Sequence, residues 1–287
     1  MRSTTQFKDL LSQKRALTLP GAANAMFARV VEDLGFEACY VSGAGIANMH
    51  LGAPDIGLTT LTEIANAVSA ISDAITLPLM VDGDTGFGNA VNMHRTIKVL
   101  ERAGAAAIQI EDQVFPKKCG HFNGKEVIPC AEMVAKIKAA VDARTDADFQ
   151  IIARTDARAI EGIDKAIERA HAFIEAGADA TFVEAPLDFD EMARIARELV
   201  VPQIANIVFG GKTPDPGRAR LADMGFGGVL YANASLQAAL RAAYQVLGSL
   251  KEHGSLDLVA DQLASFEERQ RVVDKPKWDA MEARYKV

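Results

Sequence analysis

The chain has 287 residues, of which 49% are hydrophobic, and a formal net charge of −7. This length can bury a large core, and the negative charge disfavours binding to nucleic acid or to anionic membranes. Three cysteines without a CxxC pair argue against a disulfide framework and give no sign of zinc. With no signal-peptide core at the start and no apolar run of roughly 20 residues, we expect a cytoplasmic protein without a membrane span.

Short apolar segments alternate along the chain with alanine-rich stretches whose apolar residues recur every three or four positions. The segments predict strands at residues 18–22, 38–43, 77–84, 106–112, 150–156, 181–186, 202–208 and 227–233. The stretches predict helices, most clearly at residues 59–75, 89–104, 131–144 and 163–177.

Eight such repeats predict an α/β fold, a (β/α)8 barrel. The alternative is a doubly wound open sheet, which the absence of GxGxxG after the first strand weakens. We expect one domain over residues 1–287, with a charged helical tail from about residue 252 that folds back or reaches a neighbouring subunit.

Polar residues follow several predicted strands, where the active site of a barrel is built. Asp82 and Asp84 end the third strand in DGDTGFG, and Glu111 or Asp112 ends the fourth. An oxygen-rich cluster without paired His or Cys suits magnesium better than zinc. The alternative is that DGD forms an ordinary turn, because Asp-Gly is common in turns.

A further set of strand ends offers groups for anion binding. Arg154 ends the fifth strand and either clamps a substrate carboxylate or pairs with Glu184 or Asp156. Ser42 and Gly43, after the second strand, offer a hydroxyl and a backbone N–H.

The stretch PKKCGHFNGK lies in a long loop, residues 113–130, after the fourth strand. Cys119 stands there among Lys117, Lys118 and His121, and nearby cations favour a reactive thiol. Such a cysteine acts as a nucleophile or as a general acid on a lid. The alternative is an incidental thiol, which is our interpretation for Cys39 and Cys130.

KKCGH after EDQVFP, with DGDTGFG upstream and ARTDAR and VEAP downstream, resembles the isocitrate lyase/phosphoenolpyruvate mutase superfamily over about residues 5–250. KKCGH resembles its carbon–carbon lyase branch, the 2-methylisocitrate lyase and 2,3-dimethylmalate lyase type. The resemblance implies a barrel whose eighth helix is swapped between subunits of a homotetramer, and a Mg²⁺ ion, with Mn²⁺ as a substitute.

The resemblance also implies roles for individual residues. The metal site consists of Asp82, Asp84, Asp55 and Glu111. The substrate-binding residues are Ser42, Gly43, Gly120, Arg154 and Asn206. The catalytic residues are Cys119 as general acid with Lys117, His121, Tyr40 and Glu184, and Tyr40 is a candidate base.

The implied reaction is retro-aldol-like cleavage of a 2-hydroxy dicarboxylate or tricarboxylate, of the 2-alkylmalate or 2-methylisocitrate type, into pyruvate and a carboxylate. The stretch NIVFGGKTPDPG resembles the alkylmalate and oxaloacetate enzymes more, which favours a 2-alkyl- or 2,3-dialkylmalate. Phe87, Phe122 or Phe209 either shapes an alkyl pocket or, as we favour, belongs to the core. The alternatives are oxaloacetate hydrolysis and a non-catalytic barrel that binds a metabolite.

Overall fold

The computed structural model describes residues 1–120 and 124–286. Eight parallel strands lie within these residues, and they are hydrogen-bonded in the order β6-β5-β4-β3-β2-β1-β8-β7. Their bounds are β1 Leu17–Ala22, β2 Cys39–Val41, β3 Leu79–Asp82, β4 Ala107–Glu111, β5 Gln150–Thr155, β6 Ala180–Val183, β7 Ile204–Asn206 and β8 Gly228–Tyr231. Each strand overlaps its predicted segment, so the predicted order of eight strands is confirmed.

The sheet is a nearly closed barrel. Its two end strands, β6 and β7, meet through one parallel bridge between Thr181 and Gln203. The hydroxyl of Thr181 also donates to the Gln203 side chain at 2.7 Å. The (β/α)8 barrel is therefore confirmed, and the doubly wound alternative is wrong.

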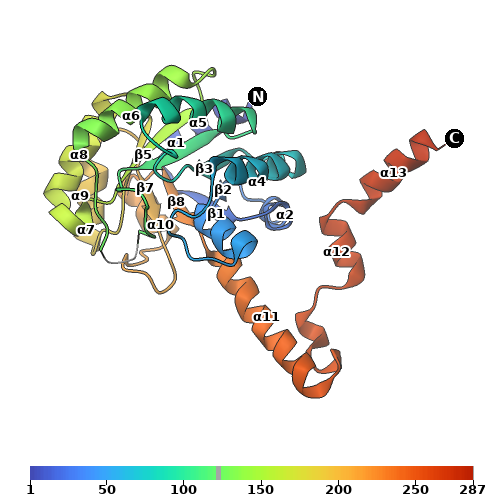
Figure 1. Cartoon of the computed structure of the whole chain (residues 1–287). Coiled ribbons are helices and arrows are strands. Elements are labelled where there is room, and N and C mark those ends of the chain that lie inside the picture. Colours follow the sequence, from blue (N-terminus) through green and yellow to red (C-terminus); the bar gives the residue numbers. More distant parts are fainter. Residues whose placement is uncertain (121–123, 287) are drawn as a thin grey trace.

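Helices follow the strands and surround the barrel (Figure 1). They are α1 Ser3–Ser12, α2 Ala25–Asp33, α3 Gly43–Ile46 with a π-helical turn Ala47–Leu51, α4 Leu61–Ala74, α5 Ala90–Arg102, α6 Cys130–Ala143, α7 Arg158–Glu161, α8 Ile163–Glu175, α9 Phe189–Glu198 and α10 Arg218–Met224. Local sequence fixes where several begin. A reciprocal capping box starts α4, where Thr60 accepts from the Glu63 N–H and Glu63 accepts from the Thr60 N–H.

The barrel interior is filled by side chains from the strands and closed at one end by α1. Phe7, Leu10 and Leu11 of α1 pack into the same cluster as Leu19 and Phe182 of the strands. Because α1 occupies the end where the strands begin, the opposite end, at the strand C-termini, is left for a site.

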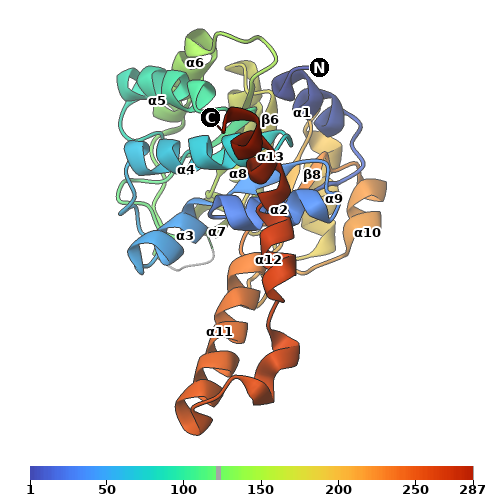
Figure 2. The same cartoon turned by 90° about the vertical axis from the view of Figure 1, so that its right-hand side faces the viewer.

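Helix α11, Ala234–His253, leaves the barrel instead of covering it, and a 3₁₀ helix, Asp257–Gln262, α12, Phe266–Val272, and α13, Lys275–Tyr285, follow it (Figures 1 and 2). None of the residues of α11 is buried. The tail that we predicted from about residue 252 thus begins to depart at Ala234. We call residues 234–286 the arm.

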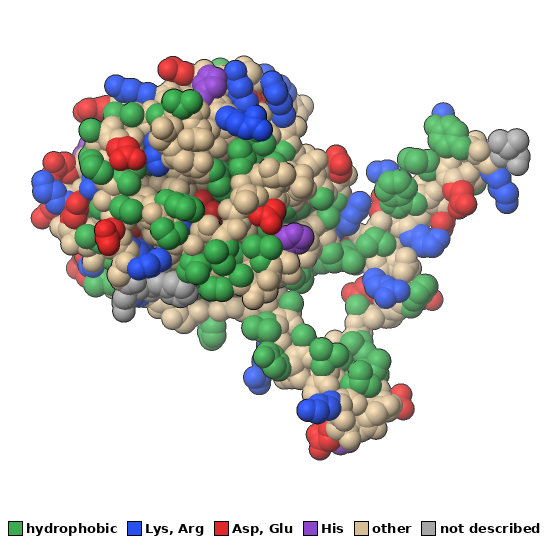
Figure 3. All heavy atoms as spheres, viewed as in Figure 1, with side chains coloured by type: hydrophobic (Ala, Val, Ile, Leu, Met, Phe, Trp, Pro, Cys, Tyr) green, Lys and Arg blue, Asp and Glu red, His purple; other side chains and the backbone are tan. Residues whose placement is uncertain are grey.

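The arm exposes large apolar side chains along its length (Figure 3). They are Leu240, Tyr244, Leu247, Leu250, Leu256, Leu258, Leu263, Phe266, Trp278, Met281 and Tyr285. Arg271 of the arm forms an ion pair with Asp33 of the barrel at 2.7 Å. Among residues 1–120 and 124–286 we find no helix with the length and apolar character that a membrane span requires.

Candidate active site

A cavity of about 30 Å³ lies at the C-terminal ends of the strands, and residues predicted from the sequence line it. They are Tyr40, Ser42, Asp55, Asp82, Lys117, Cys119, Gly120, Arg154 and Asn206. Gly43, Asp84, Glu111 and Glu184 do not line the cavity but contact residues that do. His121 lies outside the described residues, as does Phe122.

The acidic side of the cavity is formed by the turn after β3 and by the loop before α4. Lys117 reaches across it, with its Nζ 2.5 Å from Asp55 Oδ1 and 2.9 Å from Asp84 Oδ1. Asp82 Oδ2 accepts the Gly43 N–H at 3.3 Å. Burial is the main effect on Asp84 and raises its pKa to about 6. The Lys117 ammonium opposes this shift.

The DGD motif is a turn and an acid cluster at once. Gly86 N–H donates to the Gly83 carbonyl at 2.8 Å, which closes the turn. Asp84 adopts a left-handed backbone with φ 46°, and its N–H donates to Asp82 Oδ1 at 3.2 Å. The turn therefore places both carboxylates at the strand end, so the two interpretations of the motif do not exclude each other.

Glu111 and Asp112 end β4 but point to different environments. Asp112 is occupied away from the cavity, since it accepts from the Thr155 hydroxyl at 2.7 Å and from the Asp156 N–H at 2.9 Å. Glu111 Oε1 is buried and has no hydrogen-bond partner among the described residues. Burial raises the pKa of Glu111 well above its ordinary value, although Arg154 and Lys117 oppose the shift.

Arg154 is the centre of a buried ion-pair network. Its Nε lies 2.9 Å from Asp156 Oδ2 and 3.4 Å from Glu111 Oε2, and its Nη1 lies 3.1 Å from Glu184 Oε2. Asn206 Nδ2 donates to Glu184 Oε2 at 3.2 Å. Arg154 thus forms the predicted ion pairs and also lines the cavity, so the carboxylates fix the guanidinium in place at the site.

Lys125 is a site residue that the sequence interpretation missed. Its Nζ lies 2.6 Å from Asp156 Oδ1 and donates to the Gly120 carbonyl at 2.5 Å. Its side chain is only 2% exposed. Lys125 therefore ties the cysteine loop to the Arg154 network. The sequence shows Lys125 only as a lysine in a glycine-bearing loop. Its contacts depend on how that loop folds back onto the barrel.

The loop that carries Cys119 is held at both ends. Gln113 pairs with Val127 in an antiparallel bridge, and the Gln113 side chain bonds both the N–H and the carbonyl of Lys118 at 2.8 Å. The Lys118 ammonium donates to the Gly124 carbonyl at 2.5 Å. Both lysines beside Cys119 are therefore bonded to other groups, and the half-buried Cys119 lines the cavity.

Gly120 lies where only glycine fits. A Cβ at this position would be 2.7 Å from the Glu184 Cδ and closer still to Arg154 Nη2. The backbone of the loop therefore packs directly on the Arg154–Glu184 pair.

Tyr40 also lines the cavity, and its hydroxyl donates to Gln109 Oε1 at 3.2 Å. Burial, followed by the charge of Asp82, raises the pKa of Tyr40 well above its ordinary value. The Tyr40 hydroxyl is therefore a hydrogen-bonded group in the cavity wall, and its role as a base stays a prediction.

The residues around the cavity fit a divalent cation. No three His, Cys, Asp or Glu side chains in the described part of the chain stand together as a complete ligand set. Magnesium, however, usually keeps several waters and needs only one or two protein carboxylates. The unpartnered Glu111 Oε1 is an acceptor that a metal-bound water would satisfy.

Charge counting supports the same fit. The described site contains six carboxylates, namely Asp55, Asp82, Asp84, Glu111, Asp156 and Glu184, and three cations, namely Lys117, Lys125 and Arg154. If all are ionised, the surplus is three negative charges. An anionic substrate would be repelled by this surplus unless a cation compensated it.

The two remaining cysteines and Phe87 match the structural interpretation, whereas the core interpretation is wrong for Phe209. Cys39 is buried in β2, and burial raises its pKa to about 12. Cys130 begins α6, away from the cavity. Phe87 packs against the main core, whereas Phe209 is 89% exposed.

Comparison with known proteins agrees with this architecture. The sequence profile of the family described as phosphoenolpyruvate phosphomutase matches residues 7–251. A 2,3-dimethylmalate lyase from Eubacterium barkeri is 46% identical over 268 residues, 93% of this chain and 93% of that protein. A 2-methylisocitrate lyase from Aeropyrum pernix is 45% identical over 256 residues, 89% of this chain and 82% of that protein.

Solved structures of other members superpose closely. Oxaloacetate acetylhydrolase in complex with 3,3-difluorooxalacetate has a TM-score of 0.92 at 31% identity, covering 98% of this chain and 95% of that chain. Phosphonopyruvate hydrolase in complex with oxalate and Mg²⁺ has a TM-score of 0.90 at 31% identity, covering 99% of both chains.

Proposed function

The chain belongs to the phosphoenolpyruvate phosphomutase family, and within that family we propose that it is a carbon–carbon lyase. It cleaves a 2-hydroxy dicarboxylate or tricarboxylate of the 2-alkylmalate or 2-methylisocitrate type into pyruvate and a carboxylate. The observation that carries the proposal is that Cys119 lines one cavity with Asp82 and Arg154. A proton donor, an acid cluster and a carboxylate clamp therefore face the same small volume.

Asp82, Asp84, Asp55 and Glu111 hold a divalent cation, Mg²⁺ or Mn²⁺, directly or through water. When bound, this ion offsets the negative surplus and stabilises negative charge on the hydroxy-acid end of the substrate. Arg154, the Ser42–Gly43 backbone, Gly120 and Asn206 hold substrate carboxylates.

Cleavage needs one proton removed and one supplied. A base of the site takes the proton of the C2 hydroxyl, and C2 becomes the keto carbon of pyruvate as the C2–C3 bond breaks. The electron pair of that bond moves to the carboxylate fragment. The Cys119 thiol then protonates C3 of that fragment, which leaves the enzyme as a saturated carboxylate. Lys117, His121 and Glu184 complete the surroundings of this transfer, and Lys125 positions Gly120 beside it.

The loop must move for turnover, because the cavity of about 30 Å³ is far smaller than the roughly 300 Å³ of a usual ligand pocket. Its anchors at Gln113 and Lys125 lie on either side of Cys119. Closure around a bound substrate would keep water from the transient carbanion.

Assembly and location are parts of the same proposal. The arm leaves its own barrel and exposes apolar side chains such as Phe266 and Trp278, which a second subunit would cover. We therefore propose the swapped arrangement of a homotetramer. The low use of cysteine favours the cytoplasm.

The test is pyruvate release from 2,3-dimethylmalate and 2-methylisocitrate with Mg²⁺, repeated after EDTA treatment. We expect pyruvate that is lost with EDTA and restored by Mg²⁺. The Cys119→Ser variant should lose about 10²- to 10⁴-fold in kcat while it still binds substrate. The matched control, Cys130→Ser, removes a thiol outside the cavity and should keep its rate.

Oxaloacetate hydrolysis is the second candidate, favoured by the similarity to oxaloacetate acetylhydrolase. Oxalate release from oxaloacetate, without pyruvate release from 2,3-dimethylmalate or 2-methylisocitrate, would replace the lyase proposal with oxaloacetate hydrolysis. No product from any of these substrates would remove both and leave a metabolite-binding barrel.

A further inference from the structure

Arg169 of α8 is a buried arginine that lies outside the cavity and contacts both ends of the cysteine loop. Its residue is 9% exposed, and it does not line the cavity. The Nη1 atom donates to the Ile128 carbonyl at 3.0 Å and lies 3.5 Å from Asp112 Oδ2. Asp112 stands directly before the loop that carries Cys119, and Ile128 stands at its return.

The cysteine loop leaves and rejoins the barrel through two short antiparallel segments, residues 112–114 and 126–128, which we call the neck. The Ile128 N–H donates to the Asp112 carbonyl at 2.8 Å, where the two segments meet the barrel. The antiparallel bridge described above continues this pairing outwards. Arg169 therefore bonds one group from each segment of the neck.

Asp112 also joins the neck to the end of β5. Its carboxylate is completely buried, and it accepts from the Thr155 hydroxyl at 2.7 Å and from the Asp156 N–H at 2.9 Å. The Asp156 side chain in turn lies 2.9 Å from Arg154 Nε. The neck thus keeps a fixed position relative to the guanidinium that we expect to hold a substrate carboxylate.

Glu161 of α7 fixes the orientation of the Arg169 side chain. Its carboxylate accepts from Arg169 Nε at 2.9 Å and from Nη2 at 3.0 Å, which is a bidentate pair. This pair leaves Nη1 to bond the neck. Because the guanidinium is planar and its N–H groups diverge, Arg169 bonds α7 and the neck at once, which the single ammonium of a lysine cannot reproduce.

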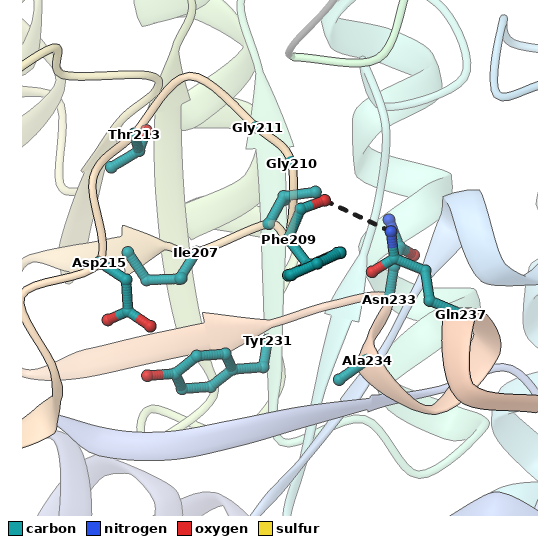
Figure 4. A pocket seen from close by; sticks show the side chains of 11 residues that line it. Ile207, Phe209, Gly210, Gly211, Thr213, Asp215, Tyr231, Asn233, Ala234 and Gln237 are labelled. Atoms are coloured by element: carbon teal, nitrogen blue, oxygen red, sulfur yellow. Dashed lines mark hydrogen bonds between the residues drawn. The ribbon is translucent and has the colours of Figure 1, made fainter.

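The loop after β7 is held in a different way. It borders a pocket of about 380 Å³ beside β8, and the Gln237 amide of α11 donates to its Phe209 carbonyl at 3.4 Å (Figure 4). Both residues are exposed, Phe209 to 89%. Water replaces an exposed bond at little cost, whereas a buried group left without its partner costs much more. The buried contacts of Arg169 therefore hold the neck far more firmly than an exposed amide holds the loop after β7.

We propose that Arg169 is a positioning residue for proton transfer from Cys119. The inference rests on the proposed lyase function, in which this thiol protonates the carboxylate fragment. Lys117 and Lys125 bond to the barrel beyond the neck, on the part of the loop that must move for turnover. A neck that stays in place returns Cys119 to the same position in every cycle, and a misplacement of about 1 Å can cost about 100-fold in rate.

The test follows the proton that Cys119 supplies, by running the reaction in D₂O. Cleavage of 2,3-dimethylmalate releases pyruvate and propionate, and cleavage of 2-methylisocitrate releases pyruvate and succinate. The former C3 gains one deuteron beside its own hydrogen and becomes a chiral centre, so a thiol at a fixed place gives one enantiomer. We expect one enantiomer from the parent chain. The Arg169→Met variant should release both enantiomers, with kcat/KM lowered by about 10- to 100-fold.

Arg144→Met is the matched control. Arg144 also bonds one carboxylate and one backbone carbonyl, with Nη1 2.6 Å from Asp179 Oδ2 and 2.8 Å from the Phe149 carbonyl. These partners directly precede β6 and β5, so the contacts lie at the opposite end of the barrel. The control should release one enantiomer at the parental rate.

Two further variants cover the case in which Arg169→Met does not fold. Arg169→Lys keeps a positive charge near the buried Asp112 but loses the planar fork. Glu161→Gln keeps Arg169 but weakens the pair that orients it. Both should fold, as checked by circular dichroism, and both should release some of the second enantiomer.

Alkylation of Cys119 by iodoacetamide tests the same inference without turnover. Mass spectrometry follows the peptide that carries Cys119 separately from the peptide that carries Cys130. A loosened neck opens the cavity more often, so alkylation of Cys119 should be at least about tenfold faster in Arg169→Met or Arg169→Lys than in the parent. The rate in Arg144→Met should equal the parental rate.

The outcomes separate this inference from the lyase function. A single enantiomer from the folded Arg169 variants would refute the inference even if kcat falls, because the fall would then have a purely structural cause. A parental alkylation rate in those variants would also refute it, and both results leave the lyase function standing. If the parent releases no pyruvate from either substrate, the lyase function fails, and the alkylation rates alone decide whether Arg169 positions the cysteine loop.

Discussion

Replacing Lys125 by methionine should destabilise the protein far more than its single ion pair would suggest. Lys125 Nζ and Asp156 Oδ1 are 2.6 Å apart, and the two side chains are 2% and 0% exposed. Removing one partner of such a buried pair leaves the other charge without compensation, which costs about 3–5 kcal/mol. The variant also loses the bond to the Gly120 carbonyl, so the cysteine loop loses one of its anchors.

Lys165→Met is the matched control. Its Nζ lies at the same 2.6 Å from Glu168 Oε2, but the side chains are 59% and 69% exposed. Water already solvates this pair, so its loss should leave stability unchanged within error. Urea unfolding at pH 7, followed by circular dichroism, measures both variants against the parent chain. Equal midpoints for the two variants would refute the reasoning that burial decides the effect.

The stability difference between the parent chain and the Lys125→Met variant should depend on pH in one direction. Burial alone would raise the pKa of Asp156, but Arg154 and Lys125 hold it at about 2. A lowered carboxyl pKa stabilises the fold fully above the ordinary value of 3.8 and ceases to do so as the pH falls through about 2. The gap between the Lys125→Met variant and the parent should therefore narrow as the pH falls from 3.8 towards 2. A gap that widened over this range would contradict the assignment of Asp156 as the partner.

Three further outcomes follow from the site and the arm. Gly120→Ala should lower kcat/KM by about 5- to 150-fold, because the added methyl group would overlap Glu184 and Arg154 and cost about 1–3 kcal/mol when the cysteine loop packs on them. An unchanged kcat/KM would show that the loop does not pack this way during turnover. Mg²⁺ at 100 times its Kd should raise the free energy of unfolding of the EDTA-treated protein by about 2.7 kcal/mol, as measured by urea unfolding. The Asp82→Asn variant should lose most of this stabilisation. Equal stabilisation of the parent and the variant would exclude Asp82 from the metal site. Phe266→Ser combined with Trp278→Ser should lower the assembled mass in light scattering, because both apolar side chains are exposed on the isolated chain; an unchanged mass would place the subunit contacts elsewhere.

The strands and the set of strand-end residues could be predicted because they depend on local patterns. A run of apolar residues before DGD or before EDQ is a strand by its own composition, and barrel geometry brings every strand end to one face. The predicted cavity residues Asp82, Arg154 and Asn206 therefore meet although they are far apart in sequence. Lys125 could not be placed, because its partner Asp156 is reached only after the loop folds back on Gln113 and Val127.

The arm shows the same limit. The pattern of α11 is amphipathic and predicts a helix, but its departure from the barrel depends on what covers its apolar face in space.

The sequence by itself thus determined which residues form strands, which polar groups stand at their ends, and where the cysteine lies. These features depend on neighbours a few positions away. Only the tertiary structure decided which charges pair, and that Asp112 points away from the cavity while Glu111 keeps an unpartnered oxygen. Pairing and pocket shape depend on distances between segments that are remote in the chain, and burial sets the strength of each interaction only once those segments have packed.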